Sequence, residues 1–298
     1  MTERKRVVAL GFFDGVHLGH GALMKRAVLR AEEIGAVPTV VSFDTHPDTL
    51  VRGVEVPLIG GTAEREDILS RLYGIRDVIL VHFDRAMMET PWKDFADRLR
   101  TEMDAVHIVV GDDFRFGYRG EGTAERLAAY CRENGMGIDV ISRVEIDGVT
   151  ISSTYIRGLL TDGEMERANA FLGHPYTLID TVRSGFRLGR TIGAPTINMR
   201  FAPGVLQPRR GVYATKAYFD GAEYAAVTNV GVRPTVGGTD AVTVESFLLG
   251  FSGELYGKQV RLEFFGFLRA ERKFDSVELL KKQIEADVKA VRAYFEKN

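Results

Sequence analysis

The feature that most constrains the fold is an alternation, through the first half of the chain, of short β-branched runs with longer amphipathic segments. Such alternation is typical of βαβ units around a parallel sheet, because each helix carries the chain back across the sheet before the next strand begins. We expect strands at residues 7–10, 37–43, 78–83, 106–110 and 138–141. Helices are expected at residues 20–34, 63–73, 91–103, 124–133, 154–160 and 164–172. Thr90 before Pro91 has the sequence of a helix N-cap followed by a first-turn proline.

The pattern changes at Gly173-His174-Pro175, after which strands and turns dominate. Apolar runs at residues 176–182, 211–219, 223–230, 242–249 and 259–268 follow one another without intervening helices, which predicts an antiparallel barrel or sandwich. Asp275 and Glu278 have the spacing of a capping box at the start of a last helix. Its apolar stripe is expected to dock on the barrel rather than on a partner: Val277, Leu280, Ile284, Val288, Val291 and Phe295. We therefore predict two domains, residues 1–173 and 174–298.

The composition excludes several classes of protein. With 298 residues, 45% of them hydrophobic and 27% charged, the chain is typical of a globular protein of two domains. Lys and Arg total 39 against 41 Asp and Glu, so a broad basic face for nucleic acid is not expected, although a local site can still bind anionic small molecules. Cys131 is the single cysteine, which excludes a disulfide framework and fits a cytoplasmic protein. No run approaches the ~20 apolar residues that span a membrane, so no membrane partner is expected.

The densest motif is Gly11-Phe12-Phe13-Asp14-Gly15-Val16-His17-Leu18-Gly19-His20, where the first expected strand meets the first helix. Glycines let the backbone approach a ligand closely, and the helix start offers N–H groups and a positive dipole end to phosphate. His17 and His20 can both face such a pocket and donate to triphosphate oxygens as pyrophosphate leaves. From the residues alone, two other interpretations stay open: a turn with two surface histidines, or a two-histidine metal pair.

This stretch resembles the HxGH signature of the nucleotidylyltransferase superfamily, and specifically its flavin branch, the FAD synthetases. Three further motifs of that branch follow in order: SFDTHP at residues 42–47, GDDFRFG at 111–117 and ISSTYIR at 151–157. The resemblance implies a Rossmann-like α/β fold of the nucleotidylyltransferase type, in which His17, His20 and Arg157 are catalytic. It also implies ATP and flavin contacts from Gly11, Phe13, Asp14, Gly15, Asp113, Ser152, Ser153 and Thr154.

Some of these residues have a local rationale of their own. Ser152 to Thr154 form a helix start that can hold phosphate through hydroxyl and N–H groups, and the forked guanidinium of Arg157 lies one turn further on. Taken alone, such a start is an ordinary N-cap in most proteins. Asp113 follows an expected strand, at the carboxyl end where parallel sheets bind ligands, and a polar loop is the alternative.

A second motif, residues 185–198, joins three glycines spaced by four to a Pro-Thr-Ile-Asn tail. The glycines can wrap phosphates through backbone N–H groups, and Thr196 and Asn198 offer oxygen ligands suited to Mg²⁺. Because alternate residues of a strand share a face, both can reach one ion if the segment is extended. An ordinary glycine-rich turn is the alternative. The motif resembles the riboflavin kinase signature, which implies ATP or flavin contacts at the following positions: Gly189, Arg190, Gly193 and Arg233.

Glu245 is a carboxylate within an apolar strand, between Val244 and Phe247. The kinase resemblance implies that it is the general base, which takes the proton from the ribityl 5′-hydroxyl of riboflavin as that oxygen attacks the γ-phosphate of ATP. From the residues alone, a glutamate on the outward face of the strand is an equally good interpretation.

Together the motifs identify the chain as a member of the bifunctional riboflavin kinase and FMN adenylyltransferase family. Membership implies an α/β parallel-sheet domain followed by an antiparallel β-barrel domain with a C-terminal helix. It implies two ATP-dependent steps, from riboflavin to FMN and from FMN to FAD, with Mg²⁺ as cofactor. The alternatives are another HxGH transferase with a non-catalytic flavin-binding barrel, a flavin carrier without turnover, and a nucleic-acid-binding barrel. The sequence predicts no oligomeric state.

Overall fold

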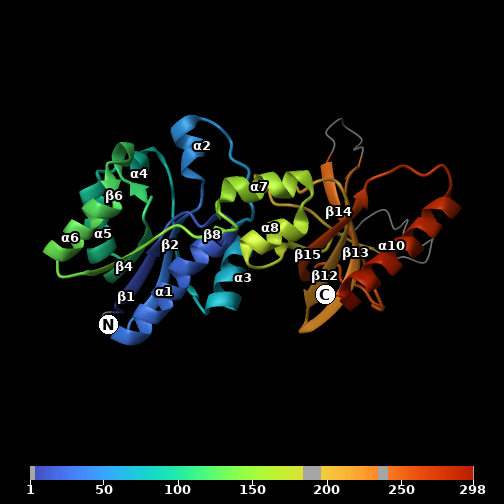
Figure 1. The fold of residues 1–298 in the computed structure, drawn as a ribbon, viewed down its shortest axis with the longest axis horizontal. Coiled ribbons are helices and arrows are strands. Elements are labelled where there is room, and N and C mark those ends of the chain that lie inside the picture. Colours follow the sequence, from blue (N-terminus) through green and yellow to red (C-terminus); the bar gives the residue numbers. More distant parts are fainter. Residues whose placement is uncertain (1–3, 184–195, 234–240, 298) are drawn as a thin grey trace. The chain divides into compact units, whose positions relative to one another are not determined.

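The computed structural model describes residues 4–183, 196–233 and 241–297 (Figure 1). The chain divides into two compact units, residues 1–153 and 154–298, and each is considered by itself. Among the described residues, no helix has both the length and the apolar character needed to cross a membrane.

The first unit is built on a five-stranded sheet in which every neighbouring pair of strands is parallel. Its strands are β1 (Arg6–Leu10), β2 (Val37–Phe43), β3 (Asp77–Val81), β4 (Ala105–Gly111) and β7 (Gly137–Ile141). The order is β3-β2-β1-β4-β7, so the chain moves outward on one side of β1 and then on the other. The point beside β1 where the order reverses is where such sheets bind ligands. The α/β architecture expected from the alternating pattern is confirmed.

Helices cover both faces of this sheet, and each face has its own apolar core. On one face, Met24 and Ala27 of α1 pack with Leu69 of α3, and on the other Phe95 of α5 packs with Leu127 of α6. The helices are α1 (Leu18–Ile34), α2 (Pro47–Arg52), α3 (Thr62–Tyr73), α4 (Arg85–Glu89), α5 (Trp92–Thr101) and α6 (Ala124–Glu133). Two small ribbons, β5 (Arg115–Phe116) with β6 (Gly122–Thr123) and β8 (Glu145–Ile146) with β9 (Val149–Thr150), complete the unit.

The expected cap of α5 is wrong. Thr90 is the C-cap residue that follows the preceding helix α4, and its hydroxyl donates to Ala86 O at 2.9 Å. Pro91 occupies the N-cap position of α5, without a side-chain hydrogen bond. Thr90 therefore caps the C-terminus of the short helix α4, which was not expected from the pattern, instead of the N-terminus of α5.

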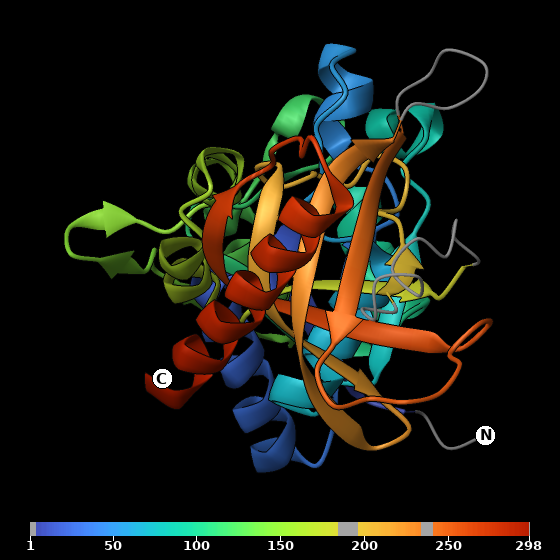
Figure 2. The same cartoon turned by 90° about the vertical axis from the view of Figure 1, so that its right-hand side faces the viewer.

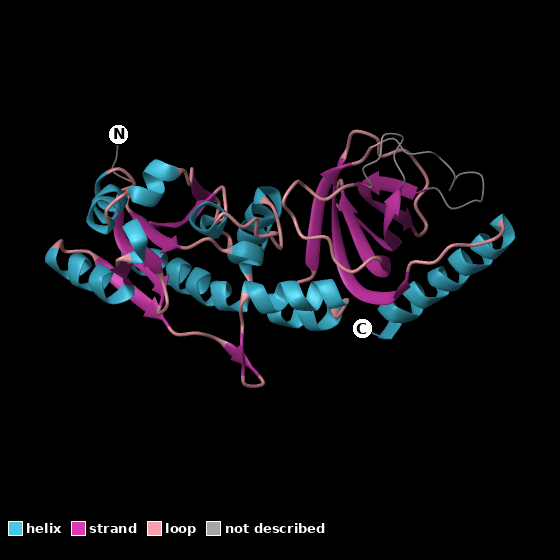
Figure 3. Cartoon of the chain, turned by 90° about the horizontal axis from the view of Figure 1, so that it is seen from above, coloured by secondary structure: helices cyan, strands magenta, loops and turns pink. Residues whose placement is uncertain are grey.

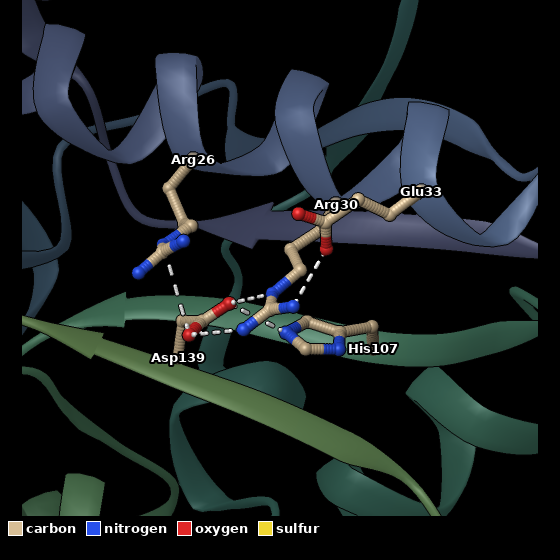
Figure 4. A network of polar contacts seen from close by, with 5 residues as sticks. All are labelled: Arg26, Arg30, Glu33, His107 and Asp139. Carbon is tan, nitrogen blue, oxygen red and sulfur yellow. Dashed lines mark hydrogen bonds and ion pairs between the residues drawn. The ribbon is translucent and has the colours of Figure 1, made fainter.

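A polar network ties α1 to the edge strand of the sheet (Figure 4). The Asp139 carboxylate on β7 accepts hydrogen bonds from Arg30 Nε at 2.8 Å and from His107 Nε2 at 2.9 Å. Arg26 lies 3.7 Å from the same carboxylate, and Arg30 also pairs with Glu33 at 2.6 Å. Burial alone would raise the pKa of Asp139, but the bonds from Arg30 and His107 outweigh it and hold that pKa below its usual value.

The described part of the second unit contains three helices and one antiparallel sheet, and Figure 3 shows how strands dominate it. The helices α7 (Ser153–Asp162) and α8 (Met165–Leu172) come first. The six strands are β10 (Tyr176–Thr181), β11 (Thr196–Met199), β12 (Gly211–Phe219), β13 (Ala222–Arg233), β14 (Ala241–Leu248) and β15 (Gln259–Ala270), ordered β10-β15-β12-β13-β14-β11. A bridge between Arg183 and Asn198 links the segment after β10 to β11 and so draws the two edges of the sheet together. The predicted antiparallel barrel is confirmed.

The interior of the barrel is apolar apart from a row of hydroxyl groups. Tyr213 and Phe264 are fully buried there. Thr228 shares a 2.6 Å hydrogen bond with Thr215 and donates to Ser246 Oγ at 2.8 Å, and all three residues are 0% exposed. Because successive residues of a strand point to opposite faces, the residues beside Ser246 in β14 point outward.

The last helix, α10 (Val277–Lys297), lies along the outer face of the barrel (Figure 2). Val291 packs there against Val212 and Val227, which confirms the predicted docking stripe over its C-terminal half. At the start of the helix the prediction is wrong, because Val277 is 55% exposed. The cap is Ser276, whose Oγ accepts from Leu279 N at 3.2 Å, one residue later than the expected Asp275.

Candidate functional site

A cavity of about 910 Å³ opens at the carboxyl ends of the strands of the first unit. Its wall comes from the segments that follow β1, β2, β4 and β7, together with residues 150–153. Seven of the predicted ligand-contacting or catalytic residues line it: Gly11, Phe13, His17, His20, Asp113, Ser152 and Ser153. Residues far apart in the sequence thus meet at the position where the strand order reverses, as the sequence motifs anticipate.

The turn between β1 and α1 carries unusual backbone angles. Phe13 has φ 58° and Val16 has φ 41°, and neither is glycine. A β-branched residue at positive φ is a genuine outlier, and each such residue costs about 1–3 kcal/mol. Gly15 has φ 71°, and a Cβ there would lie 2.9 Å from Ile59 Cγ2, so the position requires glycine. The turn keeps this shape only because its surroundings hold it.

Asp14 supplies part of that support. It is 2% exposed, and its Oδ1 accepts from Ile59 N at 2.8 Å. Its backbone carbonyl accepts from Ser153 Oγ at 3.1 Å. Asp14 and Gly15 do not line the cavity, so the roles predicted for them in ligand binding stay predictions.

His17 and His20 form a stacked pair at the start of α1. Their ring centroids lie 3.5 Å apart at an interplanar angle of 15°, and His17 Nδ1 accepts from His20 N at 3.3 Å as the N-cap of the helix. His20 Nδ1 is buried and has no hydrogen-bond partner among the described residues. Burial, followed by the charges of His17 and Arg65, holds the pKa of His20 well below its ordinary value. His20 is therefore a neutral imidazole at the cavity near pH 7.

Further residues at the cavity were not singled out from the sequence. Arg143 lies 3.3 Å from the Asp113 carboxylate and 3.7 Å from that of Asp112, and all three line the wall. Arg65 lies beneath the wall residue Phe12, with its guanidinium 4.7 Å from the ring centroid. Only one weak feature of the sequence points to Arg65. It precedes the buried Ile68 by three residues and therefore lies on the apolar face of α3.

Thr154 and Arg157 fall in the second unit, on α7. The Arg157 guanidinium donates to Thr154 Oγ1 at 3.2 Å. The catalytic role predicted for Arg157, like the phosphate contact predicted for Thr154, stays a prediction.

A row of polar side chains crosses three strands of the barrel. Glu245 in β14 stands opposite Asn198 in β11 and Asn229 in β13. Directly opposed residues of an antiparallel pair share a face, so the three side chains lie together on the outer face of the barrel, and Glu245 is half-buried. Asn198 Oδ1 is buried and has no hydrogen-bond partner among the described residues. Thr196 lies two residues before Asn198 and therefore on the same face.

The same row continues to Glu271. A Cβ placed on Gly231 would lie 2.1 Å from Glu271 Oε1 and 2.8 Å from Asn229 Nδ2, so both polar groups border that glycine. Glu271 was not singled out from the sequence. Gly189, Arg190 and Gly193 lie outside the described residues, as does the side chain of Arg233 at the end of β13.

Comparison with known proteins agrees with this arrangement. A family described as FAD synthetase matches residues 1–155, and one described as riboflavin kinase matches residues 172–295. A bifunctional riboflavin kinase/FMN adenylyltransferase of Listeria monocytogenes is 35% identical over 99% of this chain and 94% of the relative, and that of Bacillus subtilis is 34% identical over 98% and 93%. A crystal structure from Streptococcus pneumoniae, described as a macrolide-efflux protein, has a TM-score of 0.84 and 30% identity over 98% of this chain and 95% of the other.

Two family models match the chain, and the alignments cover nearly the whole length of the curated relatives. Together with the polar residues at the cavity and those on the outer face of the barrel, these matches lead to one assignment. The chain phosphorylates riboflavin to FMN and adenylylates FMN to FAD, with ATP as co-substrate of both reactions. It belongs to the family of bifunctional riboflavin kinases and FMN adenylyltransferases.

Proposed function

We propose that the cavity of the first unit is the site of FMN adenylyltransfer and that the outer face of the barrel is the site of riboflavin phosphorylation. The observation that carries the first assignment is the stacked His17–His20 pair at the wall of the 910 Å³ cavity, beside β1. Ligand sites have volumes of roughly 300–1,000 Å³, so the cavity is large enough for a nucleotide with a flavin.

In adenylyltransfer, a phosphate oxygen of FMN bonds to the α-phosphorus of ATP while the bond from that phosphorus to the bridging oxygen of pyrophosphate breaks. Negative charge accumulates on the leaving pyrophosphate. We assign His17 and His20 to donate hydrogen bonds to those oxygens, and Ser152 and Ser153, which line the same cavity, to hold phosphate through their backbone N–H groups and the Ser152 hydroxyl. Arg143, released from Asp113, would be a further cation available to the phosphates.

In the kinase reaction, the ribityl 5′-hydroxyl oxygen of riboflavin bonds to the γ-phosphorus of ATP, and ADP leaves. We assign Glu245 to accept the hydroxyl proton. It lies in one row with Asn198 and Asn229, whose amides can orient the carboxylate and the substrate.

The residues beside Glu245 fit the Mg²⁺ that this family of reactions implies. Asn198 Oδ1 is a buried oxygen without a hydrogen-bond partner among the described residues, which suits a hard cation. Thr196 would provide a second oxygen from the same face. When bound, Mg²⁺ neutralises phosphate oxygens during transfer.

Two full-length variants test the placement of the activities. H17A/H20A removes two donors, each of which contributes ~10²-fold by analogy with oxyanion-hole donors, so FAD formation from FMN should fall while FMN formation persists. E245Q keeps the shape but removes the base, which contributes ~10²- to 10⁴-fold, so riboflavin should accumulate while FMN is still converted to FAD. Chromatography of the flavins after incubation with ATP and Mg²⁺ separates the outcomes. Normal FAD formation by H17A/H20A, or normal kinase turnover by E245Q, would refute the corresponding assignment.

The domain boundary predicted at residue 173 and the cytoplasmic location inferred from the single Cys131 also remain proposals. The first compact unit ends at residue 153, whereas the riboflavin kinase family match begins at residue 172. Helices α7 and α8 lie between these two positions.

A further inference from the structure

Arg65 on α3 is a buried cation near the cavity, and no motif of the family resemblance contains it. Its side chain is 3% exposed. Nη1 donates to two uncharged acceptors, Ser42 Oγ at 2.7 Å and Phe43 O at 3.0 Å. Nε is buried without a hydrogen-bond partner among the described residues. Burying a guanidinium in such surroundings is costly, so its presence beneath the cavity requires an explanation.

The hydrogen bonds of Arg65 reach the strained turn before α1. Ser42 Oγ, which accepts from Arg65, itself donates to Phe12 O at 2.8 Å. The guanidinium also faces the Phe12 ring, whose centroid is 4.7 Å away. Phe12 directly precedes Phe13, the first of the two residues held at positive φ. Arg65 thus fixes both the backbone and the ring of the residue that leads into the turn.

The charge of Arg65 acts on the same turn. Burial is the main cause that lowers the pKa of Arg65, and the negative charges of Asp14 and Glu66 oppose it. The positive charge also contributes to the low pKa of His20, after burial and His17. Arg65 does not line the cavity, so it acts on a ligand there only across the intervening residues.

We propose that Arg65 is a positioning residue for FMN adenylyltransfer, which holds Phe12 and the turn in shape and sets a permanent positive charge behind the histidine pair. The proposal rests on the placement of adenylyltransfer in this cavity. The fixed charge favours the neutral form of His20 in the free enzyme, and it favours negative charge on the pyrophosphate as that group leaves. Such a preformed charge needs no rearrangement during the reaction.

The other charged and titratable side chains around His20 are known and can be held constant. His17 stacks on its ring. The remaining charged or titratable residues of the cavity wall are His46, Asp48, Arg52, Asp112, Asp113, Arg115 and Arg143. A change confined to Arg65 leaves all of these in place, so a shift in the titration of His20 reports the loss of that one charge.

The test compares full-length R65M, which removes the charge, with R65K, which keeps it but loses the planar fork. R71M is the matched control, because Arg71 lies on the same helix in an ion pair with Asp67. For each protein we would measure kcat and KM for FAD formation from FMN, riboflavin kinase activity, and the pKa of His20 by NMR of its labelled ring among the 6 histidines.

R65M is expected to lower kcat for FAD formation by ~10- to 100-fold, as misplacement of reacting groups does, with kinase activity unchanged. It is also expected to raise the pKa of His20, which a purely structural role for Arg65 would leave unmoved. R65K should keep the pKa of His20 near that of the wild type and recover part of the lost kcat. R71M should match the wild type in every measurement.

Wild-type kcat in R65M, or an unmoved pKa of His20, would overturn the proposal. If R65M fails to fold, R65K decides: a reduced kcat at an unchanged pKa of His20 supports the positioning role, and a wild-type kcat overturns it. A wrong placement of adenylyltransfer is recognised separately, because H17A/H20A would then retain FAD formation whatever R65M does.

Discussion

The Asp139 network of Figure 4 sets a measurable part of the stability of the first unit. In D139N, one side-chain oxygen remains to accept from Arg30 or from His107, while the new amide faces the other donor. Asp139 is 14% exposed, and charge-assisted hydrogen bonds contribute about 1.5–3 kcal/mol each. Losing one of the two short bonds should therefore cost about 2 kcal/mol, which for 150–250 residues lowers the unfolding midpoint by about 4–8 °C.

Thermal unfolding followed by circular dichroism, with FAD formation as a second probe, measures this change. E33Q is the control, because it alters a more exposed member of the same network. The Glu33 side chain is 44% exposed, so this variant should shift the unfolding midpoint much less. The pH dependence gives a second check. The pKa of Asp139 is lower in the folded than in the unfolded chain, so its stabilisation is present above the unfolded pKa and is lost as pH falls through the folded one. The difference in unfolding midpoint between wild type and D139N should therefore become smaller at acid pH. Equal midpoints at neutral pH would refute the reasoning.

Two further predictions concern the division of labour and the barrel interior. A fragment of residues 1–173 should convert FMN to FAD without phosphorylating riboflavin. A second fragment, which ends at residue 162 and so omits α8, is assayed beside it. Kinase activity in either fragment contradicts the assignment. T228V removes the central hydroxyl of the buried row and leaves Ser246 Oγ without its donor. The free energy of unfolding, measured by urea titration, should therefore fall by about 1–3 kcal/mol. T181V, at an exposed position, is the control and should change this free energy little.

The strands that could be predicted are those whose own residue types favour a strand, without help from contacts elsewhere in the fold. Runs rich in β-branched or aromatic residues, such as β2 and β12, match their expected ranges, because a half-buried position on a sheet favours those residue types. The elements that the pattern did not indicate are short: α2, α4, β11 and the two ribbons of the first unit. Segments of two to six residues carry too little periodicity to stand out, and tertiary contacts decide their conformation.

The predictability of the candidate site follows the same logic. His17 and His20 lie within one contiguous stretch whose glycines and spacing have a chemical meaning that can be read directly. Arg65 lies on an ordinary amphipathic helix, and what distinguishes it, burial against Phe12 and a bond to Ser42, exists only once α3 has packed on the sheet. Glu271 is similar, since only the position of Gly231 brings its carboxylate beside Asn229.

The orientation of Glu245 shows how the fold itself places a functional group. Val244 and Leu248 are buried at 0% and 2%, and Ser246 completes the interior hydroxyl row. Because side chains alternate along a strand, a slip of one residue in the pairing of β14 would turn these apolar side chains out and force Glu245 into the barrel. That cost fixes the register. Val244, one of the apolar neighbours that made the carboxylate conspicuous in the sequence, is therefore also one of the residues that hold Glu245 on the outer face, opposite Asn198 and Asn229.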